Sequence, residues 1–219
     1  MITLAIDAST YVGTVAVWRG DALAASGEAA MRGAQAERLM PTVAEALAKA
    51  GVPGGPADRI ICGGGPGSFT SLRIAGSIAK GLATGWGAML LSVPSLALIV
   101  AAGDALPPGR YLAVLDALRG ESYVGLYLRG ADGSVAELAP ARILPAASVD
   151  NAAAESHAIA IGPTHGGGAM PHARGALSTL ATLGEAARVD LSAWEPDYGR
   201  LAEAQVRWEA THGRPLRTG

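Results

Sequence analysis

The sequence predicts an α/β protein in which mixed sheets build two lobes. Three apolar segments separated by turns open the chain, and short apolar segments then alternate with helical patterns to about residue 102. The opening pattern returns after residue 110: one apolar strand ends in Asp7, another ends in Asp116, and further strands follow each. We interpret this return as an internal duplication; the alternative is that two unrelated hairpins resemble each other.

The first half carries an ordered series of strand and helix signals. Arg-Gly-Asp at 19–21 reads as a hairpin turn and not as an adhesion motif. The first helix should bury Leu39, Val43 and Leu47 on one face and end at Gly51, with Pro41 in its first turn or at a kink. The expected strands span 2–7, 14–18, 22–29, 59–62 and 89–93, and the expected helices span 34–50, 70–85 and 95–102.

The second half begins after residues 103–109, GDALPPG, which are rich in helix and strand breakers. We place the lobe boundary there, giving lobes 1–105 and 106–219, and we expect the final helix to pack back on the first lobe. The expected strands span 111–116, 122–128, 134–139 and 158–162, and the expected helices span 176–188 and 199–210. The glycine- and histidine-containing loop 162–175 suggests no role.

Composition favours a soluble cytoplasmic protein. The net charge of −2 gives the chain no general attraction for a polyanion, so contact with a nucleic acid should be indirect. Cys62 is the only cysteine, which favours a reducing compartment. The N-terminus lacks the basic start and apolar run of a signal peptide, and no apolar stretch reaches the roughly 20 residues that a membrane span needs.

The glycine-rich run GGGPGSFT at 63–70 resembles several functional loops but matches none of them. Phe69 stands where a Walker A loop would need lysine. Ser68 lacks the flanking glycines of a nucleophile elbow, and Thr70 replaces the last glycine of a dinucleotide fingerprint. A strand, a tight turn and a helix capped by Ser68 or Thr70 remain. We favour this structural interpretation over an anion site at the helix start.

The helix after this run carries a stripe of small residues. Ala75, Ala79 and Ala83 recur every four residues, and Gly76 lies beside them. Small side chains let another helix approach closely. We therefore predict a partner interface, and the alternative is that the chain itself covers both faces of the helix. The predicted interface residues are Leu72, Ala75, Gly76, Ala79 and Ala83.

The strand-end aspartates suggest a nucleotide cleft between the lobes. Asp7, Ser9 and Thr10 could face phosphates and hold Mg²⁺ through water, with Asp116 at the matching place in the second half. The alternative is that Asp7 caps a turn. Of the four histidines, only His165 and His172 share a loop, so we expect no metal site. Catalytic constellations are also missing, and ATP with Mg²⁺ is only weakly suggested as a cofactor.

Several motifs resemble those of the TsaB (YeaZ) family. They are Asp7-Ala8-Ser9-Thr10, GPGSFT at 65–70 with Leu72-Arg73-Ile74 after it, LDALRGESY at 115–123 and EPDYGR at 195–200. The resemblance implies a duplicated ribonuclease-H-like fold of the actin, heat-shock chaperone and sugar-kinase type. It also implies a non-catalytic subunit that dimerises alone. Such subunits pair with the TsaD catalytic subunit, joined by the TsaE ATPase, for threonylcarbamoylation of N6 of the adenosine next to the tRNA anticodon.

Two positions depart from the family pattern. Ser71 stands where the family has glycine, and Gln35-Ala36 stands where many members have histidine followed by serine or threonine. The second departure argues against a remaining metal or catalytic role. Two other functions stay open from the sequence: a stand-alone ATP-binding enzyme of the actin-like fold, and a metallopeptidase of the glycoprotease type.

Overall fold

The first sheet contains five strands in the order β3-β2-β1-β4-β5. The computed structural model describes residues 1–32, 38–103, 106–200 and 211–213. β1, β2 and β3 form an antiparallel meander, and β4 and β5 run parallel to β1. This arrangement is the ribonuclease-H-like one. The strands are β1 (Ile2–Asp7), β2 (Val12–Arg19), β3 (Ala22–Ala30), β4 (Arg59–Gly63) and β5 (Met89–Val93).

The second sheet repeats the first with one strand fewer. Its order is β8-β7-β6-β9, with an antiparallel meander and a final strand parallel to β6. In the register, Asp7 pairs with Thr14 and Asp116 with Ser122, so the two aspartates occupy matching positions. The repeated topology agrees with the predicted duplication. The strands are β6 (Gly109–Leu118), β7 (Glu121–Arg129), β8 (Val135–Pro145) and β9 (Ile159–Ile161).

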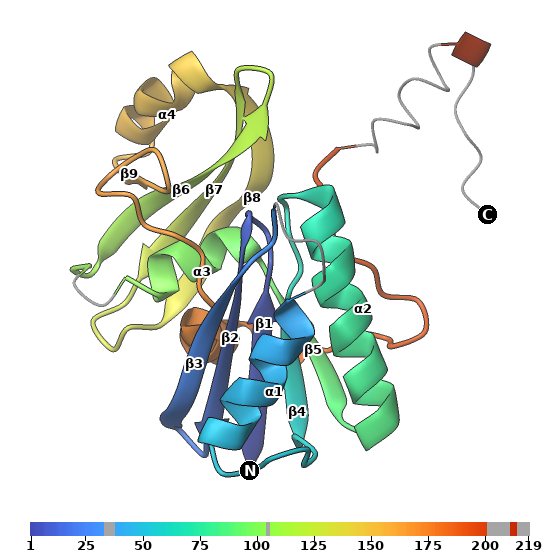
Figure 1. Ribbon diagram of the computed structural model, residues 1–219. Coiled ribbons are helices and arrows are strands. Elements are labelled where there is room, and N and C mark those ends of the chain that lie inside the picture. Colours follow the sequence, from blue (N-terminus) through green and yellow to red (C-terminus); the bar gives the residue numbers. More distant parts are fainter. Residues whose placement is uncertain (33–37, 104–105, 201–210, 214–219) are drawn as a thin grey trace.

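Helices and sheets alternate in five layers (Figure 1). α1 and α2 cover one face of the first sheet, α3 and α5 lie between the sheets, and α4 covers the outer face of the second sheet. α3 belongs to the first half of the chain but packs mainly on the second sheet. The helices are α1 (Leu39–Lys49), α2 (Phe69–Trp86), α3 (Ser95–Ala101), α4 (Val149–Glu155) and α5 (Ala176–Leu183).

The packing of the two halves crosses the predicted lobe boundary in both directions. While α3 packs on the second sheet, the segment from Ala173 to Ala187 packs on the first sheet around Trp18 and Ile61. Residues 104 and 105 lie outside the described part of the chain. The division into 1–105 and 106–219 therefore stays a prediction.

Most predicted elements occur at the expected places, and the differences have local causes. Pro41 is the third residue of α1, in the first turn, where its missing N–H costs no helical hydrogen bond. The helix predicted over 176–188 ends at Leu183, because Gly184 has φ 52 and a 3-10 turn follows. β8 continues to Pro145, and the short α4 was not predicted. Of the predicted helices 34–50 and 199–210, residues 34–37 and 201–210 lie outside the described residues.

Candidate functional site

The glycine run 63–67 is the place where two other chain segments, the turn after β1 and the segment around Asp197, approach the backbone closely. A Cβ on Gly63 would collide with the carboxylate of Asp7, and one on Gly67 would collide with the carbonyl of Ser9. Gly65 has φ 92, and a Cβ there would meet the carbonyl of Asp197. Glycine is thus required for close packing and, at Gly65, for a left-handed conformation. This geometry supports the structural interpretation of the run.

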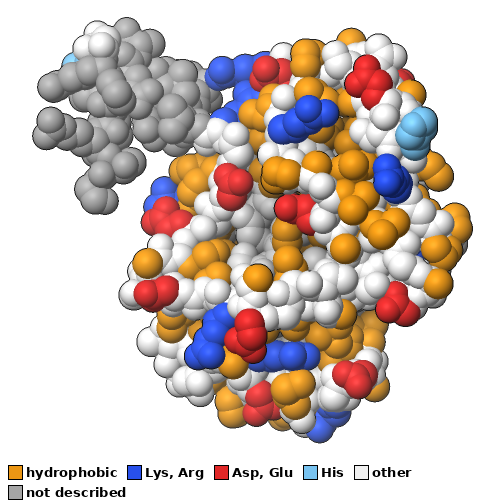
Figure 2. Space-filling model, turned by 180° about the vertical axis from the view of Figure 1, so that it is seen from behind, with side chains coloured by type: hydrophobic (Ala, Val, Ile, Leu, Met, Phe, Trp, Pro, Cys, Tyr) orange, Lys and Arg blue, Asp and Glu red, His pale blue; other side chains and the backbone are white. Residues whose placement is uncertain are grey.

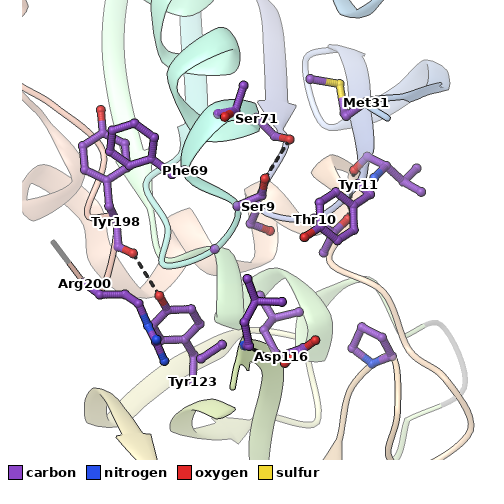
Figure 3. Close-up of a pocket in the computed structure, with 18 of the residues that line it drawn as sticks. Ser9, Thr10, Tyr11, Met31, Phe69, Ser71, Asp116, Tyr123, Tyr198 and Arg200 are labelled. Atoms are coloured by element: carbon purple, nitrogen blue, oxygen red, sulfur yellow. Dashed lines mark hydrogen bonds between the residues drawn. The ribbon is translucent and has the colours of Figure 1, made fainter. Parts of the chain in front are cut away.

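A cleft of about 970 Å³ opens where the two sheets' strand-end turns face each other. The turn after β1, the start of α2 and the hairpin between β6 and β7 line it. Figure 3 shows Thr10 and Tyr11 on one side, Phe69 and Tyr198 on the other, and Asp116 between them. A hollow of this volume is within the size range of small-molecule sites.

Of the four residues that the sequence predicted to bind a nucleotide, three line this cleft and one is buried beneath its surface. Ser9, Thr10 and Asp116 line the cleft. Asp7 is fully buried, and its carboxylate accepts hydrogen bonds from Ser95 Oγ at 2.6 Å and from Ser9 Oγ at 2.8 Å. Burial raises the pKa of Asp7 above its ordinary value, although the hydrogen bonds from Ser95 and Ser9 oppose the rise. Asp7 therefore holds a turn together instead of facing the cleft.

Asp116 is exposed at the cleft, but its carboxylate also has a local role. Its Oδ1 accepts a 2.7 Å hydrogen bond from the backbone N–H of Leu118, which shapes the β6–β7 turn. The two strand-end aspartates do not face each other across open space. Their arrangement gives no pair of carboxylates for a shared Mg²⁺.

The interface predicted on the small-residue stripe of α2 is wrong. Leu72, Ala75 and Ala79 are completely buried, Ala83 is 1% exposed, and the alanines belong to the core under the first sheet. Gly76 is buried too, because Pro196 and Trp194 lie against it. Small side chains let α2 approach its own sheet closely, and this pattern is the same one that a helix partner would require. The sequence periodicity alone could not separate these two cases.

Aromatic residues of the cleft were missed by the sequence analysis. Tyr11, Phe69, Tyr123 and Tyr198 come from four separate segments and line one hollow. Three of the five tyrosines and the single phenylalanine lie here, whereas the other two tyrosines and the three tryptophans of the described residues do not line the cleft. Nothing in the spacing of these residues shows that the fold brings them together.

Residues 194–200 form a segment that connects α2 with the second sheet along one end of the cleft. The N–H of Asp197 donates to the carbonyl of Gly64 at 2.7 Å. The ring of Tyr198 packs on Phe69 with centroids 4.4 Å apart, and its carbonyl accepts a 3.1 Å bond from the hydroxyl of Tyr123 (Figure 3). Arg200 forms a 2.6 Å ion pair with Glu121 on β7. This segment, which we name the C-terminal strap, fixes the cleft wall.

The two histidines of loop 162–175 do not share a site. His165 contacts Thr164 through Nδ1 at 3.0 Å, whereas Nδ1 of His172 accepts a bond from the N–H of Arg174 and its Nε2 lies 3.6 Å from Glu28. In the described ranges, no three His, Cys, Asp or Glu side chains lie together in a way that could hold a metal ion.

Charged side chains of both signs are mixed over the face seen in Figure 2.

The duplicated sheets with a cleft between their strand ends define a two-lobed protein of the ribonuclease-H-like, actin type. A family model described as "TsaD: tRNA N6-adenosine threonylcarbamoyltransferase" matches residues 29–167. Relatives and solved structures named TsaB or YeaZ are similar along the chain. The chain therefore belongs to the TsaB (YeaZ) family, which shares this TsaD-type domain.

Two curated relatives are both named "tRNA threonylcarbamoyladenosine biosynthesis protein TsaB". The one from Escherichia coli is 36% identical over 135 residues, which are 61% of this chain and 58% of that protein. The one from Bacillus subtilis is 29% identical over 95% of this chain and 98% of that protein. The first alignment thus spans little more than half of its relative, and the second spans nearly all of it.

Two solved structures from Pseudomonas aeruginosa share the fold over nearly their whole length. YeaZ superposes with a TM-score of 0.72 and 28% identity, covering 90% of this chain and 99% of that one. A protein described as similar to peptidase YEAZ superposes with a TM-score of 0.74 and 27% identity, covering 91% and 99%. None of the helices in the described residues is long and apolar enough to cross a membrane.

Proposed function

We propose that this chain is a non-catalytic scaffold subunit that acts in the cytoplasm in tRNA modification. It pairs with the TsaD catalytic subunit, joined by the TsaE ATPase, for threonylcarbamoylation of N6 of the adenosine next to the anticodon. The names of the relatives and of the matching family model support this pathway. The proposal includes contact with tRNA only through the complex, and a homodimer when the partner is missing.

The burial of Asp7 is the observation that supports the proposed absence of catalysis by this chain. A carboxylate at the end of β1 could orient a metal or a nucleophile only if it faced the cleft, and this one is buried and bonded to Ser95 and Ser9. We therefore assign Asp7 a structural role, and we expect the chain to act by holding other subunits.

The outward edge of α2 replaces the buried stripe as the proposed partner surface. Ile74, Ile78 and Leu82 are half-buried there, and the exposed Ser77 and Gly81 lie between them. A shallow hollow of about 520 Å³ runs along this edge from Phe69 to Ile78. Half-exposed branched side chains separated by small ones let a partner helix pack between them.

Replacing Ile78 by Asp tests this surface. The aspartate would bring a charge into an apolar contact, so we expect association with the TsaD subunit to weaken at least about tenfold, or about 1.4 kcal/mol. Sedimentation velocity of the chain alone and of its mixture with the TsaD subunit of the same organism gives both association states. Threonylcarbamoyladenosine content of tRNA, measured in cells carrying only the variant, gives the functional result.

Ile159→Asp is the matched control, because Ile159 is 57% exposed on β9 of the other sheet. It should leave association and tRNA modification unchanged. If Ile78→Asp and Ile159→Asp behaved alike, the α2 surface would be excluded. Ala79 does not serve this test, since it is fully buried and an arginine there would disrupt the core.

A further inference from the structure

Of the four edge strands in the described part of the chain, three are protected against further pairing. β3 and β5 end the first sheet, and β8 and β9 end the second. β5 is already joined to a later segment by an antiparallel bridge between Leu91 and Arg188. β8 contains Pro140 and has two irregularities in its register with β7, and β9 has only three residues. Short strands, proline and bulges are the usual means by which proteins keep a sheet edge from pairing.

β3 is the fourth edge, and it has little of this protection. It is nine residues long, contains no proline and carries Glu28 as its single charged residue. Its one irregularity, opposite Val17 and Trp18, lies near its start and leaves residues 25–30 in regular register with β2. Figure 1 shows β3 at the open side of the first sheet, away from α2. An edge of this length and composition is a template for one more strand.

The backbone groups that point away from β2 belong to every second residue of β3. The N–H of Met31 donates to the carbonyl of Tyr11 at 2.9 Å, so this pair is bonded within the β2–β3 hairpin. In an antiparallel ladder, such pairs alternate with pairs whose backbone groups point outward. Along the register, the N–H and C=O groups of Ser26, Glu28 and Ala30 therefore face the open side. They span about 14 Å, which suits about five to seven residues of an added strand.

The face of β3 that packs on α1 carries small side chains. Ala25 and Ala29 belong to the core beneath α1, and a Cβ on Gly27 would come within 2.9 Å of Thr42 Cγ2. None of Ala25, Gly27 and Ala29 is fully exposed, so α1 holds this part of β3 in place. Cross-strand neighbours stabilise a sheet most when they are branched or aromatic. An added strand can therefore place branched apolar side chains beside these small residues, on the α1 side.

The opposite face of β3 carries one charge. Ser26, Glu28 and Ala30 are exposed there. The side chain of Glu28 is 63% exposed, and Nε2 of His172 lies 3.6 Å from its Oε1, which is too long for a hydrogen bond. Opposite charges on neighbouring strands stabilise their pairing, whereas like charges directly opposite each other destabilise it. Glu28 therefore favours an added strand with a cation at the facing position.

A second copy of β3 is a poorer occupant of this edge than a different strand. Antiparallel pairing of two β3 strands about Ser26 would place small residues opposite small ones at nearly every position, and Glu28 opposite Ala24. Alanine pairs are the reference from which cross-strand stabilisation is counted, so they add little to the backbone hydrogen bonds. The carboxylate of Glu28 would gain no cation in that arrangement. Side-chain size and charge thus both favour a strand from another protein.

We propose that the β3 edge binds an extended segment of another protein, antiparallel to β3, with branched apolar side chains on the α1 side and a lysine or arginine opposite Glu28. Main-chain hydrogen bonds supply the affinity, and the cation selects the segment. α2 packs on β1, β4 and β5, so its outward edge and the β3 edge can be occupied together. The proposal does not rest on the scaffold function.

Three dye-labelled heptapeptides test the proposal by fluorescence anisotropy with the full chain. TVRVTVT alternates valine with polar residues, TVEVTVT reverses its charge, and TVRVPVT has proline at a position whose N–H would bond to β3. We expect TVRVTVT to bind with a dissociation constant below about 0.5 mM. TVEVTVT should bind at least about threefold more weakly, because it brings like charges together. TVRVPVT should bind at least about tenfold more weakly, because proline removes a donor from the ladder.

Two variants of the chain locate the site. Glu28→Lys should reverse the preference, so that TVEVTVT binds better than TVRVTVT, and damage to the fold would not produce such a reversal. Ser26→Pro should weaken TVRVTVT at least about tenfold, because the N–H that it removes points outward and does not belong to the β2 ladder. Glu155→Lys is the matched control, since it makes the same change of charge at an exposed residue of α4. It should leave both affinities unchanged.

Amide hydrogen exchange of the wild-type chain, followed by NMR, gives the location without any variant. With TVRVTVT bound, the outward amides of Ser26, Glu28 and Ala30 should exchange at least about fivefold more slowly. The amides of Ala25 and Gly27 point toward β2 and should change less. This alternation along one strand is specific to an added neighbour.

The proposal is overturned if TVRVTVT does not bind at millimolar concentration, if TVRVPVT binds equally well, or if Glu28→Lys leaves the order of the peptides unchanged. Protection that lies outside residues 25–30 also overturns it. Sedimentation velocity tests the other occupant: a wild-type homodimer that Ser26→Pro dissociates would mean that a second copy, and not a foreign strand, covers this edge.

Discussion

The hydroxyl of Ser95 donates a 2.6 Å hydrogen bond to Oδ1 of Asp7, and both residues are completely buried. The bond joins the last residue of β1 to the first residue of α3, the helix that carries the first half of the chain onto the second sheet. The same hydroxyl also accepts the N–H of Gly65 at 3.0 Å. A single buried carboxylate thus holds the glycine run, β1 and α3 together.

Asp7 should make stability depend on pH in an unusual direction. Burial raises its pKa in the folded state above the unfolded value of 3.8, so the folded chain binds the proton more tightly. Its contribution to stability is fully present below the unfolded pKa and is lost as pH rises through the folded pKa. Asp7→Asn removes this loss. We expect the unfolding free energy of the variant minus that of wild type to increase with pH above about 4, by at most about 1.4 kcal/mol per pH unit.

Urea unfolding at several pH values between acid and neutral measures this difference. Asp132→Asn is the control, because Asp132 is an exposed-turn residue whose pKa is lowered by hydrogen bonds from Ser134. Its contribution is present above the unfolded pKa and lost as pH falls, so its variant-minus-wild-type difference should be small and should not rise with pH. A flat or falling curve for Asp7→Asn would contradict the assigned role of burial.

The fold could be predicted from the sequence because each element carries a local signal. Strand-end Asp7 and Asp116, the apolar segments and the breaker-rich residues 103–109 all lie in the order in which the structure uses them. The helix α4 escaped prediction because seven residues, VDNAAAE, are too short to show a helical period. Its apolar contacts, Val149, Ala152 and Ala153, only become meaningful once the second sheet lies beneath them.

The site could be predicted only in part, because burial is a property of the whole fold. Asp7 and Asp116 look equivalent in the sequence, yet Asp7 is enclosed by Ser95, which is 88 residues away, whereas Asp116 stays exposed. The stripe from Ala75 to Ala83 likewise fits a helix partner and the helix's own sheet equally well. The cleft aromatics lie far apart in the chain, and no local spacing connects Tyr11 with Tyr198.

Arg129 should be a main source of stability at the junction of the two halves. Its guanidinium, on β7, donates to the carbonyl of Val100 at 2.9 Å and to that of Leu106 at 3.1 Å. It therefore satisfies the end of α3 and the following segment from the second sheet. Arg129→Met should lower the unfolding free energy by about 2 to 4 kcal/mol, because these carbonyls lose a charged donor. Urea denaturation followed by circular dichroism measures the change.

Arg142→Met is the comparison for this change, since it removes an exposed arginine from the neighbouring strand β8. It should alter stability by no more than about 0.5 kcal/mol. Equal effects of the two substitutions would mean that the bonds of Arg129 to α3 contribute nothing.

Cys62 should be chemically inert in the folded protein. It is completely buried in β4, and burial, with the nearby Asp7, raises the pKa of its thiol far above the ordinary value. The thiolate is the reactive form, and the folded state suppresses both its formation and its access. At pH 8 we expect DTNB to label the native chain at least about a hundredfold more slowly than the chain in 8 M urea. Rapid labelling of the native chain would show that β4 opens easily.

The C-terminal strap should depend on the backbone of Gly199. This residue has φ 70, and a Cβ would collide with the ring of Tyr123 and approach Pro66. Gly199→Ala therefore adds both backbone strain and a steric conflict, and it should detach Tyr198 from Tyr123. We expect amide hydrogen exchange in residues 197–200 to become at least about tenfold faster, corresponding to about 1.4 kcal/mol of lost local stability. Mass spectrometry of peptic fragments measures the exchange.

Gly54→Ala separates the steric cause from the conformational one. Gly54 also has a left-handed φ of 63, but no atom lies within 4 Å of the position that its Cβ would take. It should lower global stability by about 1 kcal/mol and leave exchange in the strap unchanged. If Gly199→Ala had the same small global effect as Gly54→Ala, without faster exchange in 197–200, the contact between Tyr123 and the strap would not hold the strap in place.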